Sequence, residues 1–544
     1  MVVNFISCQS RRRRPPRRCT ALTGKPCLGC LALTKLDAEI QEINESMNNL
    51  WLRRHETLTI VNEWHDPVVG TLPVELSSYI FQLYLPEIST HDMGLTDQTR
   101  LAFQQRLKIL TSMCKAWRRI AISTPSLWST VIGDKPETID RHLQRSGTLS
   151  LSIYIQLYRY YQTDESRQNI IKSICQHIPR WRVLCIKGLT SAISFITKQT
   201  SSFAEGALSL STIFLQAVDE YGHGGKWTMR IGGPHALRPS PTCLTIQASH
   251  FLWNDIDTTK LVELSIGPVR TLSFIDILRR SPRLKTVVAS IEDANLSVSE
   301  LANLPLEPFS HLELYSLEVT NRTTQTSSLF NFVTFPSLQN LGCTTRPSNQ
   351  EQELTALHDF LLRSGCALQS LHLCHRCTEE DLLNLLQLTP NLQDLSIDET
   401  TLSSHFFRCL GGTAQDGRFL PSLRSLHFDV TRLDANAFDW SLICMMAPVP
   451  SLLAGTHLRP LSQIIVQLQS KEYAAMTEQD EMHMLALLES GVEIQARRWK
   501  VDQFQQHYLF RPALDRYWQS SCPPRKMPKG KLLSREEWNM SQNL

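Results

Sequence analysis

The chain has 544 residues, of which 42% are hydrophobic and 20% are charged, and its formal net charge is +3. These values are ordinary for a globular protein with a large core and room for several domains. So small a charge does not imply a nucleic-acid partner for the body of the protein, and none is expected. No uninterrupted run of about 18 apolar residues occurs, so no membrane-spanning helix is expected, and the 15 cysteines at irregular spacings predict reduced thiols in a cytoplasmic or nuclear protein.

Residues 1–30 form a basic, flexible arm. Arg11–Arg14 and Arg17–Arg18 flank Pro15 and Pro16, and the prolines disfavour a helix there. Two interpretations stay open. One is a nuclear import signal or a contact with an anionic surface, and the other is a plain solvated tail.

Residues 31–66 show a heptad pattern. The apolar positions alternate spacings of three and four: Leu33, Leu36, Ile40, Ile43, Met47 and Leu50. This pattern predicts a helix with one apolar seam, for which Thr34 is a candidate N-cap. The helix either packs on the module that follows it or forms a dimerising coiled coil. Pro67 and Gly70 interrupt the chain before that module.

Residues 67–132 predict a small helical module. Pro73 suits a first helical turn, and a single helix face carries Leu72, Leu76, Ile80 and Leu83. A second apolar face carries Leu107, Leu110, Cys114, Trp117 and Ile120. A module of this size cannot bury both faces alone, so some apolar surface is left for a partner.

The residues of this module resemble an F-box, in the form found in fungal (basidiomycete-like) proteins. The matching positions are Leu72, Pro73, Glu75, Leu76, Ile80, Phe81, Cys114, Lys115, Trp117 and Arg118, followed by the closing Pro125, Leu127 and Trp128. The chain departs from the family in a mostly polar insertion, Pro86–Gln105, which costs little loop entropy but leaves the geometry between the helices open.

In the F-box family these helices bind a Skp-type adaptor and, through it, a cullin. The resemblance therefore implies an adaptor-binding site. Its residues are expected to be Leu72, Pro73, Leu76, Ile80, Phe81, Leu110, Cys114 and Trp117.

Residues 148–500 predict an irregular leucine-rich-repeat solenoid of the α/β class. The phrase Pro-x-Leu-x-x-Leu recurs, as in Pro336–Leu341, Pro390–Leu395 and Pro421–Leu426. The first leucines of successive units are Leu261, Leu284, Leu312, Leu338, Leu368, Leu392 and Leu423. Proline ends one helix and starts a strand, and each unit must stack on the next to bury its leucines. A doubly wound α/β domain is the alternative, although no glycine-rich phosphate motif supports it. Further strands are expected near Ile464–Leu468 and Val492–Ala496, and residues 520–544 form a polar basic tail.

Residue patterns for catalysis are missing. The sequence has no nucleophile elbow, no His-Glu-x-x-His and no Walker sequence, and we expect no enzyme and no cofactor. The pairs Cys27–Cys30 and Cys374–Cys377 have zinc-ligand spacing, but neither has a matched second pair nearby. No metal site is expected.

An F-box followed by leucine-rich repeats resembles the substrate receptor of a cullin–RING (SCF-type) ubiquitin ligase, with the repeats holding an unknown protein substrate. The alternative is a repeat scaffold without ligase function. The receptor hypothesis predicts that Leu76, Ile80 and Phe81 remain accessible in the isolated chain. The scaffold hypothesis predicts that they are buried against residues 33–60 or the first repeats.

The alternate residues of the later repeat strands point away from the core. These include Ser370, Cys374, Ser396 and Ser425 as well as the candidate substrate-binding residues His372, Asp394, Asp398, His427 and Asp429. Stacked in register, Asp398 would lie beside Asp429, which is unfavourable unless a cation or a basic partner shares the site. The sequence therefore predicts either an acidic surface for a basic substrate segment or ordinary solvated positions.

Overall fold

The computed structural model divides the chain into two compact units, Met1–Ser129 with Gln144–Leu149, and Thr130–Leu143 with Ser150–Leu544. The structure describes residues 27–65, 71–88, 97–133, 135–157, 164–201, 210–218, 239–247, 256–292, 308–321, 327–345, 351–398, 400, 402–411, 419–429, 440–446, 460–468, 477–489 and 491–498. The arginine-rich arm and the C-terminal tail lie outside these ranges. None of the described helices is long and apolar enough to cross a membrane.

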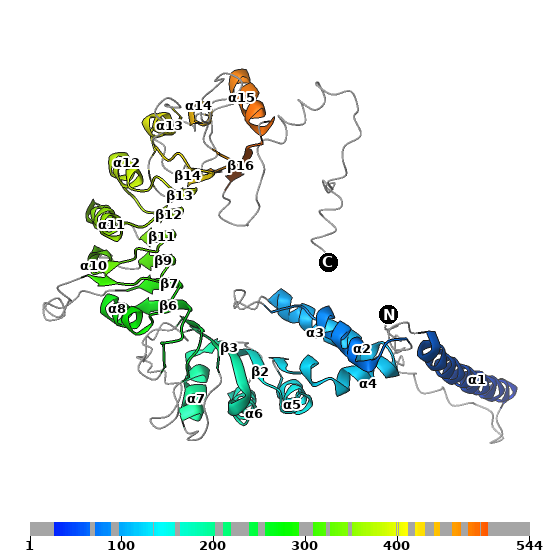
Figure 1. Ribbon diagram of the computed structural model, residues 1–544. Coiled ribbons are helices and arrows are strands. Elements are labelled where there is room, and N and C mark those ends of the chain that lie inside the picture. Colours follow the sequence, from blue (N-terminus) through cyan, green and yellow to red (C-terminus); the bar gives the residue numbers. More distant parts are fainter. Residues whose placement is uncertain are drawn as a thin grey trace. The chain divides into compact units, whose positions relative to one another are not determined.

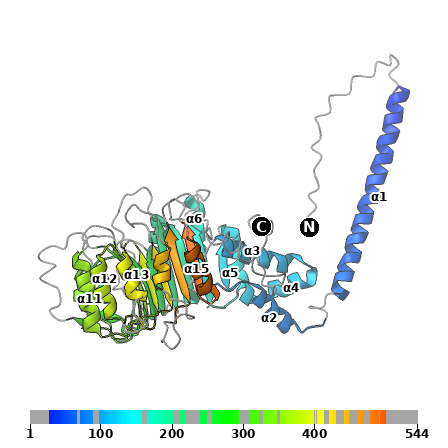
Figure 2. The ribbon, with the colours of Figure 1, turned by 90° about the horizontal axis from the view of Figure 1, so that it is seen from above.

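The first unit begins with α1 (Leu28–His65), one uninterrupted helix of 38 residues (Figure 2). It starts inside the range predicted as a flexible arm, and Thr34 is therefore not its N-cap. Instead, the Thr34 hydroxyl donates to the Cys30 carbonyl one turn back, at 2.9 Å. The six seam side chains predicted from the heptad pattern are 47–65% exposed, so the seam is uncovered.

The helical module consists of α2 (Val74–Tyr84), α3 (Asp97–Ser112), α4 (Lys115–Ser123) and the 3-10 helix η1 (Pro125–Leu127). The insertion predicted over Pro86–Gln105 is only partly a loop, because its last part forms the first turns of α3. Phe103 and Leu107, spaced by one helical turn, are 3% and 6% exposed and anchor that helix in the module.

The second unit is a parallel sheet with helices on one side. Within the described residues the sheet has fourteen strands, and their order in space is their order in the sequence. The strands are β1 (Thr130–Gly133), β2 (Leu151–Leu157), β3 (Trp181–Leu189), β4 (Thr212–Val218), β5 (Cys243–Gln247), β6 (Glu263–Val269), β7 (Thr286–Ile291), β9 (Ser316–Asn321), β11 (Asn340–Thr345), β12 (Ser370–Cys374), β13 (Asp394–Asp398), β14 (Ser425–Asp429), β15 (Gln463–Leu468) and β16 (Glu493–Arg498). Two further short strands, β8 (Phe309–Ser310) and β10 (Val333–Thr334), pair with each other.

The helices lie between successive strands. They are α5 (Pro136–Arg145), α6 (Asp164–Cys175), η2 (Ile178–Arg180), α7 (Thr190–Ser201), α8 (Thr271–Arg280), α10 (Ser327–Asn331), α11 (Glu351–Ser364), α12 (Glu379–Gln387), α13 (Ser404–Gly411), α14 (Ser441–Met446) and α15 (Glu478–Glu489). Helices α8 to α13 stand on the outer side of the curved sheet, and the strands line its inner side (Figure 1). Strictly sequential strand order is that of a solenoid and not of a doubly wound sheet, which reverses its order.

The solenoid begins earlier than the predicted residue 148. Strand β1 pairs in parallel with β2, from Thr130 beside Ser152 to Gly133 beside Ile155. Residues 130–132, which the sequence assigned to the end of the F-box range, therefore belong to the sheet. The physical reason is that Val131, fully buried beside Ile153 of β2, extends the apolar core of the first repeats.

The repeat leucines form one continuous core, with a single correction to the predicted spacing. Leu284, Leu338, Leu368, Leu392 and Leu423 are 0–1% exposed, each two residues before its strand. At β9 this position is Leu314, which is fully buried, whereas the predicted Leu312 is 69% exposed.

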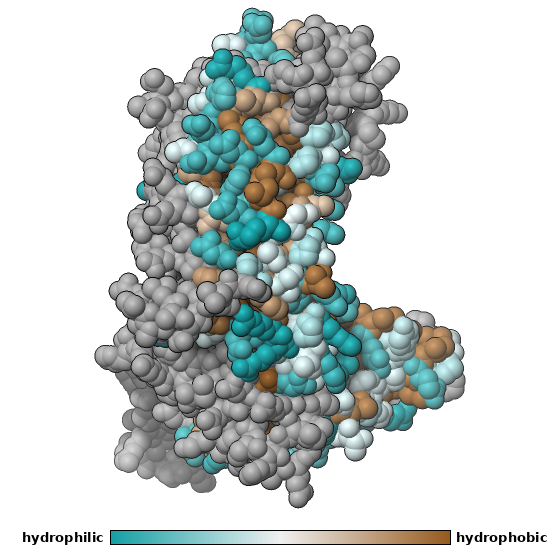
Figure 3. All heavy atoms as spheres, turned by 60° about the vertical axis from the view of Figure 1, so that its left-hand side comes forward, coloured by the Kyte–Doolittle hydropathy of each residue, from teal (hydrophilic) through white to brown (hydrophobic). Residues whose placement is uncertain are grey.

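On the side of the second unit turned forward in Figure 3, hydrophobic patches are separated by hydrophilic side chains.

Candidate functional site

One face of α2 is apolar and open to solvent. Leu76, Ile80 and Leu83 are 49%, 40% and 66% exposed, and their spacing places them on one side of the helix. The helix begins directly after Pro73, whose carbonyl accepts the Ser77 amide hydrogen at 3.0 Å. The prediction that this module cannot bury all of its apolar surface is confirmed by these exposures.

The opposite side of α2 forms the core of the module. Phe81 is 1% exposed and packs on Trp117 of α4, with the ring centroids 4.8 Å apart. Ser78 and Thr124 share a hydrogen bond of 2.9 Å between their hydroxyls. These contacts fix α2 against α4 and thereby fix the position of the exposed face of α2.

Two of the predicted adaptor-binding residues are buried in the module. The expectation that Phe81 stays accessible is wrong, because α4 covers it. Leu110 of α3 is likewise only 1% exposed. Both belong to the core of the module, while Leu76 and Ile80 are accessible as predicted.

The remaining predicted residues lie between core and surface. Cys114 is the N-cap of α4, and its sulfur accepts the Trp117 amide hydrogen at 3.3 Å. Leu72, Cys114 and Trp117 are half-buried, and Pro73 is exposed. The Cys-Lys-x-Trp part of the motif thus begins a helix and presents one side of the Trp117 ring to Phe81.

The leucine and tryptophan of the closing Pro-x-Leu-Trp sequence are buried in the module. Leu127 and Trp128 are 1% and 3% exposed, and the Trp128 indole N–H donates to the Ala121 carbonyl at 2.7 Å. The Arg145 guanidinium lies 4.4 Å from the centre of the Trp128 ring. The last part of the motif therefore packs into the core of the module.

The inner side of the solenoid carries the predicted substrate-binding residues. In β12 and β13 the side chains alternate between buried and half-exposed or exposed, as the prediction requires. His372 stands beside Ser396 in the ladder, and its Nε2 lies 3.8 Å from the Asp398 carboxylate. Ser396 is in turn beside His427, with 3.2 Å between its hydroxyl and Nδ1.

Acidic side chains extend along the same surface. Asp394 is exposed at the start of β13. Asp429 ends β14 and pairs with Gln467 in the ladder, but its side chain lies outside what the structure describes. Glu318 of β9, exposed and one strand removed from His372 across Gly342, was not predicted. The Leu314–Leu317–Val319 spacing is the signal that would have placed it there.

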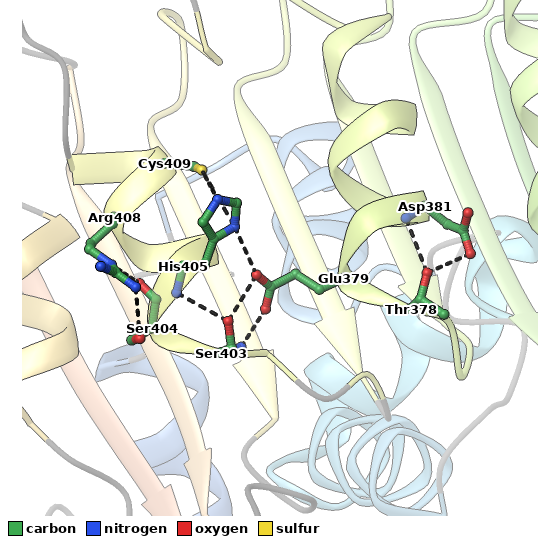
Figure 4. A network of polar contacts seen from close by, with 8 residues as sticks. All are labelled: Thr378, Glu379, Asp381, Ser403, Ser404, His405, Arg408 and Cys409. Atoms are coloured by element: carbon green, nitrogen blue, oxygen red, sulfur yellow. Dashed lines mark hydrogen bonds and ion pairs between the residues drawn. The ribbon is translucent and has the colours of Figure 1, made fainter.

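A polar network joins two outer helices at their N-termini (Figure 4). The Glu379 carboxylate accepts hydrogen bonds from the Ser403 amide and hydroxyl, and His405 Nδ1 lies 3.2 Å from it. The Cys409 sulfur lies 3.9 and 3.7 Å from the two His405 ring nitrogens. Both distances are long for a hydrogen bond to sulfur within one helix turn, and the contact lies on the exposed side of α13. The network connects α12 to the start of α13.

The Cys374–Cys377 pair is not assembled with further ligands. No group of three or more His, Cys, Asp or Glu side chains able to hold a metal occurs in the described ranges. Burial raises the pKa of the Cys377 thiol to about 11, which disfavours the thiolate that zinc requires. Its sulfur lies 3.4 Å from the Thr400 hydroxyl, which itself donates to the His375 carbonyl.

Comparison with known proteins gives a limited result. No model of a known protein family matches the chain, and no curated protein matches it significantly. Among solved structures, a chain from the crystal structure of the Rad7 and Elc1 complex in yeast aligns with 75% of this chain and 93% of that chain, at 14% identity and a TM-score of 0.32. This likeness is remote, and the function proposed below rests on the chain's own residues.

Proposed function

We propose that the chain is a substrate-recognition subunit of a cullin–RING ubiquitin ligase. In this proposal the helical module is an F-box that binds a Skp-type adaptor through α2, and the inner strands of the solenoid bind the protein to be ubiquitinated. The chain performs no bond chemistry itself. It holds a substrate near a charged conjugating enzyme, so its contribution is proximity.

The observation that carries the proposal is the division of the motif residues in the module. Phe81 and Leu127 are buried in the core, with Phe81 packed on the half-buried Trp117, while Leu76 and Ile80 remain exposed on α2. A scaffold whose module serves only local packing would bury Leu76 and Ile80 as well. Exposed apolar residues gathered on one helix face are typical of a protein interaction site.

The solenoid supplies a surface of different character. Glu318, Asp394 and Asp398 are carried by strands of the inner side, together with His372. Such a surface suits a basic segment of a protein substrate, because opposite charges steer and orient the partner. We further propose that the complex acts in the cytoplasm or nucleus, with the Arg11–Arg18 segment as the import signal.

The test is adaptor capture by the Leu76→Asp variant. Burying a large apolar side chain contributes roughly 1.5–3 kcal/mol, and an unpaired buried carboxylate costs more, so capture of a recombinant Skp-type adaptor should fall below detection. The matched control is Leu362→Asp. It places the same substitution at a leucine of α11 that is 63% exposed and should leave adaptor capture unchanged.

Circular dichroism of both variants establishes that the chain stays folded. Undiminished adaptor capture by folded Leu76→Asp would contradict the F-box proposal and favour the scaffold alternative.

A further inference from the structure

We propose that α1 pairs with α1 of a second copy of this chain in antiparallel orientation, with Glu39 of each copy beside Arg53 of the other. The starting observation is the uncovered seam. Its residues, from Leu33 to Leu50, are each about half exposed on a helix of 38 residues. Apolar side chains repeated at heptad spacing along one helix are buried when a second helix packs on them.

The heptad assignment extends through the helix. Position a holds Leu33, Ile40, Met47, Arg54 and Val61, and position d holds Leu36, Ile43, Leu50 and Thr57. In a parallel pair, a faces a, so Arg54 would face Arg54 of the second copy inside the seam. That layer would bring two like charges together, and the pair would be destabilised.

The antiparallel arrangement removes this conflict, because a then faces d. Centred on Glu45, it places Ile40 opposite Leu50 and Ile43 opposite Met47 of the second copy. Arg54 then faces Leu36, whose side chain packs on the arginine stem. The Arg54 guanidinium is already directed away from the seam, because it lies 5.3 Å from the centre of the ring of Trp51, a residue at the flanking position e.

Charge complementarity fixes the same register. Glu39 and Arg53 are both exposed residues at position g, and in the antiparallel pair g faces g. With the register set by the apolar layers, Glu39 meets Arg53 of the second copy, and the two-fold axis makes this contact twice. In the parallel pair Glu39 would instead face Asn44 and Arg53 would face Leu58, so no ion pair forms. The layers from Leu33 to Thr57 give a contact roughly 36 Å long at 1.5 Å per residue.

The experiment measures the mass of the full-length chain by sedimentation equilibrium. The wild type should sediment at twice its 62.1 kDa, and Ile43→Asp should be a monomer at the same concentration. Glu39→Arg and Arg53→Glu should each raise the dimer dissociation constant on the order of tenfold, because attractive surface pairs become repulsive ones. The combined variant, Glu39→Arg with Arg53→Glu, should recover the wild-type constant, since each reversed charge again meets its opposite.

Glu42→Arg is the matched control. It makes the same charge reversal at position c, away from the seam, and should leave dimerisation unchanged. Because every seam and flanking side chain tested is exposed, these variants should keep the circular dichroism of the wild type. A monomeric wild type at tens of micromolar overturns the proposal. It is equally overturned if the combined variant dimerises no better than the single ones, or if Glu42→Arg weakens the dimer as much as Glu39→Arg.

Discussion

The two units bury apolar residues by different means. In the helical module, α2 has one face packed on α4 through Phe81 and the other face, with Leu76, open to solvent. In the solenoid sheet, every strand between the end strands β1 and β16 has neighbours on both sides that continue its apolar layer. The outward positions of β9, β12 and β13 are mostly polar. A small module has too few residues to cover every apolar face of its helices, whereas each repeat of a solenoid is covered by the next repeat. In the proposed receptor, the partner sites would therefore differ: exposed apolar residues would bind the adaptor at the module, and exposed charges would bind the substrate at the solenoid.

The largest effect should come from the solenoid core. Phe360 of α11 is fully buried, with ring centroids 5.0 Å from Phe330 and 5.6 Å from Phe335. Phe360→Ala should lower the free energy of unfolding by about 3–5 kcal/mol, because it leaves a cavity among packed rings. Urea denaturation followed by tryptophan fluorescence and circular dichroism measures this.

The contrast with the module supplies the control. Leu83→Ala, at a residue 66% exposed on α2, should change the free energy of unfolding by less than about 0.5 kcal/mol while weakening adaptor capture. If Leu83→Ala destabilises the chain as much as Phe360→Ala, the open face of α2 is part of a core and the comparison between the units fails.

The next prediction concerns charge on the inner strands. Asp398→Lys combined with Asp429→Lys should remove substrate binding and spare adaptor capture, because it reverses the acidic surface at two neighbouring strands. Substrate binding by the wild type should also weaken as salt is raised, since exposed charges are screened. Quantitative mass spectrometry of captured proteins measures both effects.

The matched control for this variant reverses two carboxylates on the outer helices instead of on the inner strands. Asp276 and Asp359 are about half exposed on α8 and α11, and Asp276→Lys with Asp359→Lys should leave the captured proteins unchanged. Retention of the wild-type partners by the inner-strand variant would place recognition elsewhere, in the segment Tyr221–Gly233 or the C-terminal tail.

The sequence predicted most of the repeat strands, because leucine spacing and proline placement are local signals. It also identified the apolar face of α2. It could not distinguish Ile80 from its neighbour Phe81, since periodicity shows which face is apolar but not which neighbour covers a side chain. The start of β1 was missed for a related reason: Thr130–Gly133 is too short to show an alternation of its own, and its place in the sheet comes from pairing with β2.

A smaller effect is expected at the network between α12 and α13. The Glu379 carboxylate accepts hydrogen bonds from Ser403 and lies beside His405, contacts between residues of successive repeats that sequence reasoning did not predict. Glu379→Gln keeps the shape but removes the charge that strengthens these bonds, so the free energy of unfolding should fall by about 1–2 kcal/mol. Glu380→Gln, on the same helix turn, is the control and should have little effect. Equal stability of the two variants would mean that the network does not join the repeats.

The smallest change is chemical and leaves stability untouched. Burial raises the pKa of the Cys377 thiol to about 11, whereas Cys27 is exposed. At pH 8 only about one Cys377 in a thousand is then a thiolate, the form that reacts with iodoacetamide. Mass spectrometry after brief alkylation should find Cys27 labelled and Cys377 intact, and the Cys377 rate should rise about tenfold for each pH unit. Added zinc should not alter this order, because the described part of the chain offers Cys377 no complete set of ligands. Labelling of Cys377 as fast as Cys27 at pH 8 would show that the turn after β12 is open, and with it the end of the inner surface that carries Asp398.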